Sequence, residues 1–178
     1  MRSGHKYRIV VFLTLLAIIA FPGCEEANMK TINKTLEEAK EINANSDFGG
    51  MEYLQLSNLT KEQISEYNYD QPEGEGTDDF YVEGLYYPYP DRNGEMRLTQ
   101  IYISGGNYHI FDIKFGDNVD EVAEILEKRG YKETELHQMY EGTNTKKFEK
   151  YDIIIQLYTE PESYRICRIC VYTNTHAK

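Results

Sequence analysis

Basic residues are scarce in this chain of 178 residues, which has 19 lysines and arginines against 30 aspartates and glutamates and a net charge of −11. A surface of that sign repels the phosphates of nucleic acids and the head groups of anionic lipids. We therefore expect no nucleic acid partner and no membrane attachment through a basic patch. The last two-thirds of the chain are rich in Ile, Val, Phe and Tyr, so the acidity does not indicate disorder.

Long apolar runs are also missing, apart from one near the start of the chain. It extends from Ile9 to Ala20, is broken only by Thr14, and follows the basic residues Arg2, Lys6 and Arg8. A run of roughly a dozen residues is too short for a membrane-spanning helix but suits the apolar segment of a secretory signal. The sequence therefore predicts export.

A small residue and a cysteine close this segment, since Gly23 and Cys24 follow Phe21 and Pro22. The arrangement resembles the lipobox of bacterial lipoproteins, although Phe21 stands where leucine is usual. The resemblance implies that residues 1–23 are a lipoprotein signal peptide, that cleavage precedes Cys24, and that the Cys24 thiol carries diacylglycerol. We then expect the protein outside the cytoplasm, anchored to the outer face of the cell membrane or periplasmic. An ordinary secretory peptide and an uncleaved membrane anchor are the alternatives.

Only two further cysteines occur, Cys167 and Cys170, within the strand-like sequence YRICRICVY. A C-x-x-C pair can form a redox centre or hold zinc, but residues three apart in a strand point to opposite faces. Their Cα atoms then lie about 10 Å apart, beyond the reach of a disulfide. We predict two free thiols, with Cys167 on the face of Ile169 and Val171 and more buried than Cys170.

Turn-forming residues are concentrated at residues 45–50 (NSDFGG) and 70–79 (DQPEGEGTDD). The segment before the first of these breaks is polar and has only a thin apolar stripe. Residues 24–50 are therefore expected to form a tether, partly helical, behind the lipid. The remainder predicts an α+β fold, with short helices packed on antiparallel β-sheet.

Two segments predict helices in that remainder. Thr60 and Gln63 form a capping-box pattern ahead of a helix at residues 61–67, and residues 119–129 carry apolar side chains at helical spacing before Gly130. Strands are predicted at residues 53–56, 80–87, 96–104, 108–115, 131–140, 151–159 and 164–173, with a turn at residues 142–147.

The two halves of this region, residues 51–106 and 107–178, have the same order of a short helix and a sheet that ends in a hairpin. Residues 97–103 (RLTQIYI) correspond to residues 165–171 (RICRICV). This order is typical of two tandem repeats of a helix-plus-meander unit. Any helix followed by a meander would show the same order, so this alternative stays open.

Residues 111–131 (FDIKFGDNVDEVAEILEKRGY) resemble the opening of small secreted and lipid-anchored domains grouped with the outer-membrane assembly lipoprotein BamE and with β-lactamase inhibitor protein. In that group an apolar-x-x-Gly turn leads into a helix, on which a three- or four-stranded antiparallel sheet packs. The matching residues are Ile113, Gly116, Glu121, Val122 and Leu126. The resemblance covers residues 108–175 well and residues 51–104 poorly. It implies binding and scaffolding roles without a catalytic signature.

Tyrosine is abundant, with 16 residues, while tryptophan is absent. Several tyrosines flank the acidic segment at residues 70–79, and exposed tyrosine offers a large contact area together with a hydroxyl group. The candidate binding surface for a protein or a glycan comprises Tyr67, Tyr69, Asp78, Asp79, Tyr81, Tyr86, Tyr87 and Tyr89. Alternating tyrosines that pair across strands would give the same spacing without a binding role.

Residue types used in catalysis or metal binding are few and scattered. His109 and His137 lie on predicted strands and His176 near the C-terminus, without a nucleophile at a suitable spacing. The acidic residues at 70–79 lack the spacing of a calcium-binding loop. We therefore expect no catalytic residue, no metal site and no cofactor.

These features favour a lipid-anchored extracytoplasmic protein that binds or scaffolds another envelope or secreted protein and has no catalytic activity. Two alternatives stay open. One is an inhibitor or immunity-type module that blocks a secreted enzyme through the tyrosine-rich acidic face. The other is a hydrolase whose site is built from scattered residues, which a buried histidine beside a carboxylate would favour.

Overall fold

The computed structural model describes residues 22–69, 82–89, 94–134, 144–160 and 162–173. This part of the chain contains three helices and nine strands. The helices are α2 (Pro22–Ala44), α3 (Lys61–Tyr69) and α4 (Val119–Lys128). The strands are β1 (Ser46–Asp47), β2 (Val82–Pro88), β3 (Met96–Ile103), β4 (His109–Ile110), β5 (Ile113–Lys114), β6 (Lys132–Thr134), β7 (Asn144–Lys150), β8 (Ile153–Thr159) and β9 (Ile166–Thr173). The predicted α+β class is confirmed.

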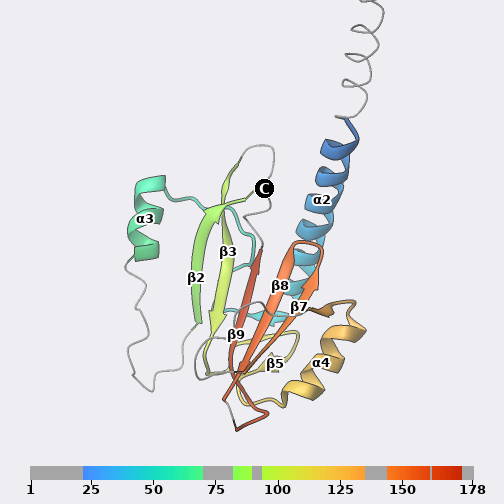
Figure 1. Ribbon diagram of the computed structural model, residues 1–178. Coiled ribbons are helices and arrows are strands. Elements are labelled where there is room, and N and C mark those ends of the chain that lie inside the picture. The colour runs from blue at the N-terminus through green and yellow to red at the C-terminus, as the bar shows by residue number, and fades with distance from the viewer. Residues whose placement is uncertain (1–21, 70–81, 90–93, 135–143, 161, 174–178) are drawn as a thin grey trace, which may run out of the picture.

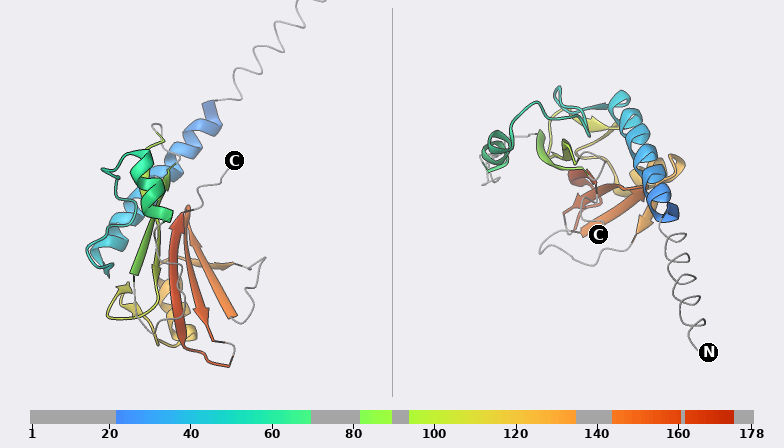
Figure 2. Two further views of the ribbon diagram at one scale, coloured as in Figure 1. Left: turned by 90° about the vertical axis from the view of Figure 1, so that its left-hand side faces the viewer. Right: turned by 90° about the horizontal axis from the view of Figure 1, so that it is seen from above.

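The described strands pair antiparallel and form two sheets. The larger sheet has the strand order β2-β3-β9-β8-β7-β6, and the smaller one consists of β1, β4 and β5. In Figure 1 the strands of the large sheet stand side by side, with α3 outside β2 at one edge. Seen from above in Figure 2, α2 passes along one side of this sheet and α3 stands apart beyond β2.

One face of the large sheet forms the hydrophobic core. Paired residues of antiparallel strands share a face, and the buried members here are Ile101, Ile103, Ile153, Ile155, Leu157, Ile169 and Val171. Buried side chains of α2 and α4 belong to the same cluster. Both helices therefore cover this side of the sheet, which we call the core face.

Helix α4 forms where the sequence predicts it. The Asn118 side chain accepts hydrogen bonds from two backbone N–H groups of the first turn and so caps the helix. Val122 and Leu126 face the core and are buried. Gly130 follows the helix with a φ of 86°, a conformation that costs glycine little, and the chain turns into β6.

Helix α3 begins with the predicted capping box, because Thr60 and Gln63 each accept a hydrogen bond from the other's backbone N–H. Near the other end of the helix, the Asn68 amide bonds to both the N–H and the carbonyl oxygen of Tyr86, at 3.1 and 2.8 Å. Because β2 is an edge strand of the large sheet, α3 covers backbone groups that would otherwise face solvent.

Helix α2 corrects the prediction of a tether over residues 24–50. Its buried residues Ile32, Thr35, Ala39 and Ile42 recur every three or four positions, so one side of the helix packs into the core. Thr35 can be buried because its hydroxyl donates to the backbone carbonyl one turn earlier. From Ile32 onward the tether prediction is wrong, and β1 then joins the small sheet.

Two of the predicted strands do not form as predicted, because residues within them have left-handed backbone conformations. Residues 108–115 form two short strands instead of one, since Phe111 and Asp112 have φ values of 53° and 66° and reverse the chain between β4 and β5. Residues 53–56 form no strand, and Leu54 has a φ of 59°. They contact β3 through one bridge between residues 56 and 97 and through backbone hydrogen bonds of residues 54 and 55 with Leu98.

The turn predicted at residues 142–147 is wrong from residue 144 onward. Residues 144–147 belong to β7, and the reversal into β8 occurs at Tyr151, which has a φ of 57°. Asn and Lys are common in turns, but here they pair along the buried strand β8, and this tertiary pairing outweighs local preference.

The two halves of the chain share one sheet. β3, the last strand of residues 51–106, pairs with β9, and Tyr102 lies directly opposite Cys170. These two residues also correspond in the alignment of residues 97–103 with residues 165–171, so the two strands are related by a local twofold arrangement. In the large sheet, the described part of the first half supplies two strands and that of the second half supplies four.

Candidate functional site

The predicted tyrosine surface does not form as one patch. Tyr67 packs edge-on against Tyr86 with ring centroids 5.6 Å apart, which attaches α3 to β2. Tyr87 is 40% exposed, whereas Tyr89 is 1% exposed and belongs to the core. The prediction that Tyr89 belongs to a binding surface is therefore wrong. Of the four tyrosines Tyr67, Tyr86, Tyr87 and Tyr89, only Tyr87 has a largely exposed ring. Asp78, Asp79, Tyr81 and the side chain of Tyr69 lie outside the described residues.

Polar and aromatic side chains line the other face of the large sheet, which we call the opposite face. Strand pairing places one residue from each strand in a row, from Glu83 through Tyr102, Cys170, Gln156 and Lys147 to Thr134. The next row runs from Leu85 through Gln100, Tyr172, Ile154 and Glu149 to Lys132. Of the described helices, α2 and α4 lie on the core face and α3 lies beside the edge strand β2.

Hydrogen bonds join neighbouring strands across the opposite face. The Tyr172 hydroxyl donates to Gln156 Oε1 at 3.2 Å. Gln100 Nε2 donates to the Tyr102 hydroxyl and lies 3.8 Å from Cys170 Sγ. Because these side chains are already held in place, contact with a partner would cost them little conformational entropy.

Glu83 introduces a poorly satisfied carboxylate into this face. Its Oε1 atom is buried and has no hydrogen-bond partner in the described part of the chain. Burial raises the pKa of the Glu83 carboxyl, while the positive charge of Arg168 lowers it in part. A donor supplied by a binding partner would satisfy this oxygen.

The two cysteines have the opposite order of burial from the prediction. Cys170 is buried at the centre of the opposite face, and Cys167 is only half-buried. A β-bulge at Tyr158 and Thr159 leaves Cys167 without a residue directly across from it in β8. Both thiols are free, and burial raises the pKa of Cys170 to about 12 and also raises the pKa of Cys167. Neither thiol is suited to nucleophilic chemistry at neutral pH.

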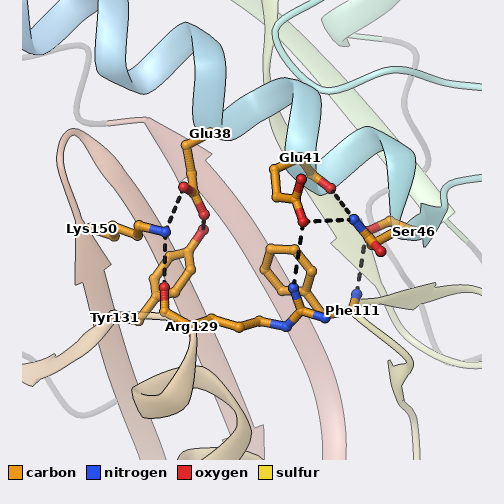
Figure 3. A network of polar contacts seen from close by, with 8 residues as sticks. Glu38, Glu41, Ser46, Phe111, Arg129, Tyr131 and Lys150 are labelled. Atoms are coloured by element: carbon orange, nitrogen blue, oxygen red, sulfur yellow. Dashed lines mark hydrogen bonds and ion pairs between the residues drawn. The ribbon is translucent and has the colours of Figure 1, made fainter.

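A second polar cluster lies on the core side, where α2 crosses the end of α4 (Figure 3). Glu38 of α2 is 8% exposed, and its carboxylate lies 2.6 Å from Lys150 Nζ and accepts a 3.0 Å hydrogen bond from the Tyr131 hydroxyl. Lys150 Nζ also donates to the Arg129 carbonyl oxygen at 2.8 Å. Burial and the Glu38 carboxylate raise the pKa of Tyr131, so its hydroxyl stays protonated as a donor.

Arg129 extends this cluster towards the small sheet. Its guanidinium carbon lies 4.1 Å from the centroid of the Phe111 ring, and Nη1 lies 3.8 Å from Glu41. The Asn45 amide donates to Glu41, and the Phe111 N–H donates to the Asn45 carbonyl oxygen. Each charged group in this cluster is matched by an opposite charge, which indicates that the cluster fastens α2 to the domain.

Of the three histidines that the sequence analysis names, the structure describes only His109. His109 lies on β4, 3.9 Å from Asp112, whose side chain is almost fully exposed. His137 and His176 lie outside the described residues. The described residues include no group of three or more His, Cys, Asp or Glu that could hold a metal ion. None of the described helices combines the length and apolarity that crossing a membrane requires.

Cys24, the predicted lipidation residue, is the third residue of α2. The helix continues from there to Ala44. About 12 Å of helix separates Cys24 from Ile32, the first residue of α2 that is buried among the described side chains. In Figure 1 the first turns of α2 extend beyond the end of the sheet. The link between Cys24 and the domain is thus helical rather than an extended tether.

The opposite face was missed by the sequence predictions, although the strands contain a signal for it. Gln100 and Tyr102 alternate with buried isoleucines in β3, and Gln156 and Tyr158 alternate with buried aliphatic residues in β8. A period of two with glutamine and tyrosine, instead of lysine and glutamate, indicates a face that is partly covered, and at its centre Cys170, Gln156 and Ile154 are buried while the tyrosines stay half-buried.

Comparisons with known proteins identify no relative. The chain matched no known protein family, no curated protein and no solved structure. Functional inference therefore depends on the residues and geometry of the chain itself.

Proposed function

We propose that this protein is a lipid-anchored, non-catalytic binding domain of the bacterial cell envelope, which holds a protein partner on the opposite face of its large sheet. One observation carries the proposal: α2 and α4 both pack on the core face, while tyrosine and glutamine side chains cross the other. Half-buried tyrosines fixed by hydrogen bonds supply contact area at low entropic cost.

The position of α2 is compatible with this role. Thr35 and Asp152 hydrogen-bond, which places the start of β8 beside α2, and the strands run alongside the helix (Figure 1). If Cys24 is anchored in the membrane, the opposite face is directed along the plane of the bilayer, neither towards the lipid nor away from it. A partner can then reach it without displacing lipid.

Lipidation is tested by labelling with a fatty acid in the native organism. We expect label on the natural chain and its recovery with membranes, and neither for Cys24→Ala. Stable anchoring needs two or more acyl chains, so detergent release should parallel the label. Label that persists on Cys24→Ala would contradict the proposal.

Binding is tested by placing a photo-crosslinking amino acid at Lys132 or at Arg168, which are exposed and lie on the opposite face, and at Ile125 as a control. Ile125 is partly exposed on α4, on the other side of the domain. We expect the same envelope protein in both adducts and none from Ile125. Equal adducts at Ile125, or no adduct at either position of the opposite face, would contradict the proposal. A secreted enzyme in the adduct would favour the inhibitor alternative.

A further inference from the structure

One end of the large sheet lies on the same side of the domain as the start of α2. The start of β3, the end of β9 and the start of β8 are neighbours at this end, which we call the anchor end. Thr35 of α2 hydrogen-bonds to Asp152 there, and the first turns of α2 project beyond it (Figure 1). In Figures 1 and 2 the end of β2 and the start of β3 reach further towards the start of α2 than the turn between β7 and β8 does. The anchor end is therefore directed to the same side as Cys24.

Large apolar and aromatic side chains are exposed at the anchor end. Leu56 and Tyr87 lie on either side of Arg97 of β3, and they are 44% and 40% exposed. Leu59 lies three residues beyond Leu56 and is 41% exposed. Tyr151, in the turn between β7 and β8, is 47% exposed. Covering these side chains would recover hydrophobic free energy that the domain alone does not gain.

The spread of these side chains suits a flat partner. β2, which carries Tyr87, and β8, which follows Tyr151, are three positions apart in the order of the sheet. That separation is about 14 Å, so a partner must contact well-separated positions at once. Tyrosine is typical of the boundary between a bilayer and water, and leucine of the apolar side chains that enter the head-group layer.

Lysine side chains accompany one of the aromatic rings. Lys34 Nζ lies 5.3 Å from the centroid of the Tyr151 ring, and Lys30, about one turn earlier on α2, is also exposed. Such side chains can keep their ammonium groups at the level of lipid phosphates while their stems contact apolar surface. The exposed Glu62 at the start of α3 offsets part of this charge, so the contact depends on leucine and tyrosine and not on a basic patch.

The helical link to Cys24 leaves little room for a protein at the anchor end. About 12 Å of helix separates Cys24 from Ile32, where α2 becomes buried among the described side chains. This length is close to the diameter of a single helix with its side chains. A folded partner therefore does not fit between the lipid and the anchor end, whereas the lipid itself is within reach.

We infer that the anchor end rests on the head groups of a phospholipid bilayer, with Tyr87, Tyr151 and the two leucines in the head-group layer. This contact rests on the proposed attachment of Cys24 and adds a second point at which the protein meets the membrane. Two points of contact fix the rotation of the domain about its anchor. The opposite face then stays directed along the plane of the bilayer, where a partner can reach it.

The chain has no tryptophan, so one introduced tryptophan reports on one position. The test uses the protein purified from its native membrane, in nanodiscs of phosphatidylcholine brominated near the top of its acyl chains, because bromine quenches nearby tryptophan. We expect a loss of fluorescence in Tyr87→Trp and in Tyr151→Trp relative to nanodiscs without bromine. The control Tyr164→Trp, at a 70% exposed position between β8 and β9 at the other end of the sheet, should lose none.

A second pair of variants tests the leucine contact. Leu59→Gln should reduce the quenching of Tyr87→Trp, whereas Ile125→Gln on α4, at a position 39% exposed, should leave it unchanged. Absence of quenching in both Tyr87→Trp and Tyr151→Trp, or equal quenching in Tyr164→Trp, would overturn the inference. Equal effects of Leu59→Gln and Ile125→Gln would do the same. An unchanged Tm by circular dichroism will establish that the variants are folded.

Failure of lipidation is a separate result from failure of this contact. The fatty-acid label on Cys24 decides lipidation. If Cys24 carries no lipid, the full chain is reconstituted through its apolar run at residues 9–20, which ends four residues before Cys24. The same quenching pattern is expected there, and its absence would overturn the inference.

Discussion

At the scale of single residues, Glu83 is a carboxylate held where burial opposes its charge. Glu83→Gln is expected to raise the free energy of unfolding at neutral pH by less than about 1 kcal/mol, because the variant no longer holds a charge in a half-buried place that solvent still screens in part. The pKa of the Glu83 carboxyl is higher in the folded protein than in the unfolded chain. The stability of the natural protein therefore falls as the pH rises from the pKa of the unfolded state to that of the folded state. The gain should therefore vanish below the unfolded pKa.

Urea unfolding at neutral pH and at about pH 3.5 measures the difference in stability between Glu83→Gln and the natural chain. Glu66→Gln changes an exposed carboxylate on α3 and should alter stability by less than about 0.5 kcal/mol at either pH. An equal gain for Glu83→Gln at both pH values would show that the side chain's charge is not the cause.

Lys150 is the cation that neutralises buried Glu38. Lys150→Met should lower the free energy of unfolding by about 3 kcal/mol, because among the described residues the Glu38 carboxylate then keeps only the Tyr131 hydroxyl as a close partner. The matched control is Lys128→Met, which removes the exposed pair with Glu124 and should cost less than about 0.5 kcal/mol. Similar losses in chemical denaturation of the two variants would mean that water reaches Glu38.

At the scale of elements, a substitution in α2 tests whether this segment is a packed helix or a tether. Glu37 is exposed in the middle of α2 and pairs only with Lys40 among the described residues. Glu37→Pro removes a helical hydrogen bond and should cost about 3 kcal/mol or more, whereas Glu37→Ala should be nearly neutral. Thermal unfolding followed by circular dichroism measures both variants. If the proline and alanine variants have the same Tm, α2 does not stabilise the folded domain.

The two edges of the large sheet also bear on function. α3 covers β2 through the Asn68 amide, and the described part of β6 at the other edge is three residues long. Covered and short edges discourage the addition of a strand from another chain. A partner is therefore expected to bind across side chains of the opposite face rather than extend the sheet.

At the scale of the whole molecule, the shared sheet makes the two halves interdependent. β3 and β9 pair across the division at residue 106, and residues of both halves belong to one hydrophobic cluster. We expect a single cooperative transition in calorimetry, with equal calorimetric and van't Hoff enthalpies. Two resolved transitions would indicate that residues 51–106 and 107–178 unfold separately, as independent repeats would.

The amino-acid sequence by itself determined the elements whose signals are local. The apolar stripe, the Asn118 cap and Gly130 define α4 within a dozen residues, and the Thr60–Gln63 capping box does the same for the start of α3. The antiparallel strands β3 and β9 follow from period-two patterns. These features, and the α+β class that they imply, depend on neighbours in the chain.

Tertiary structure alone decided which polar residues are buried and which tyrosines are exposed. Glu38 belongs to the buried side of α2 because Lys150, more than a hundred residues away, provides its partner, and equally distant Asp152 adds a second partner to the local bond of Thr35. Without those partners the same stripe is too polar to pack, which is why a local pattern predicted a tether. Burial of a polar group depends on what meets it in space, and periodicity along the chain carries no record of that contact.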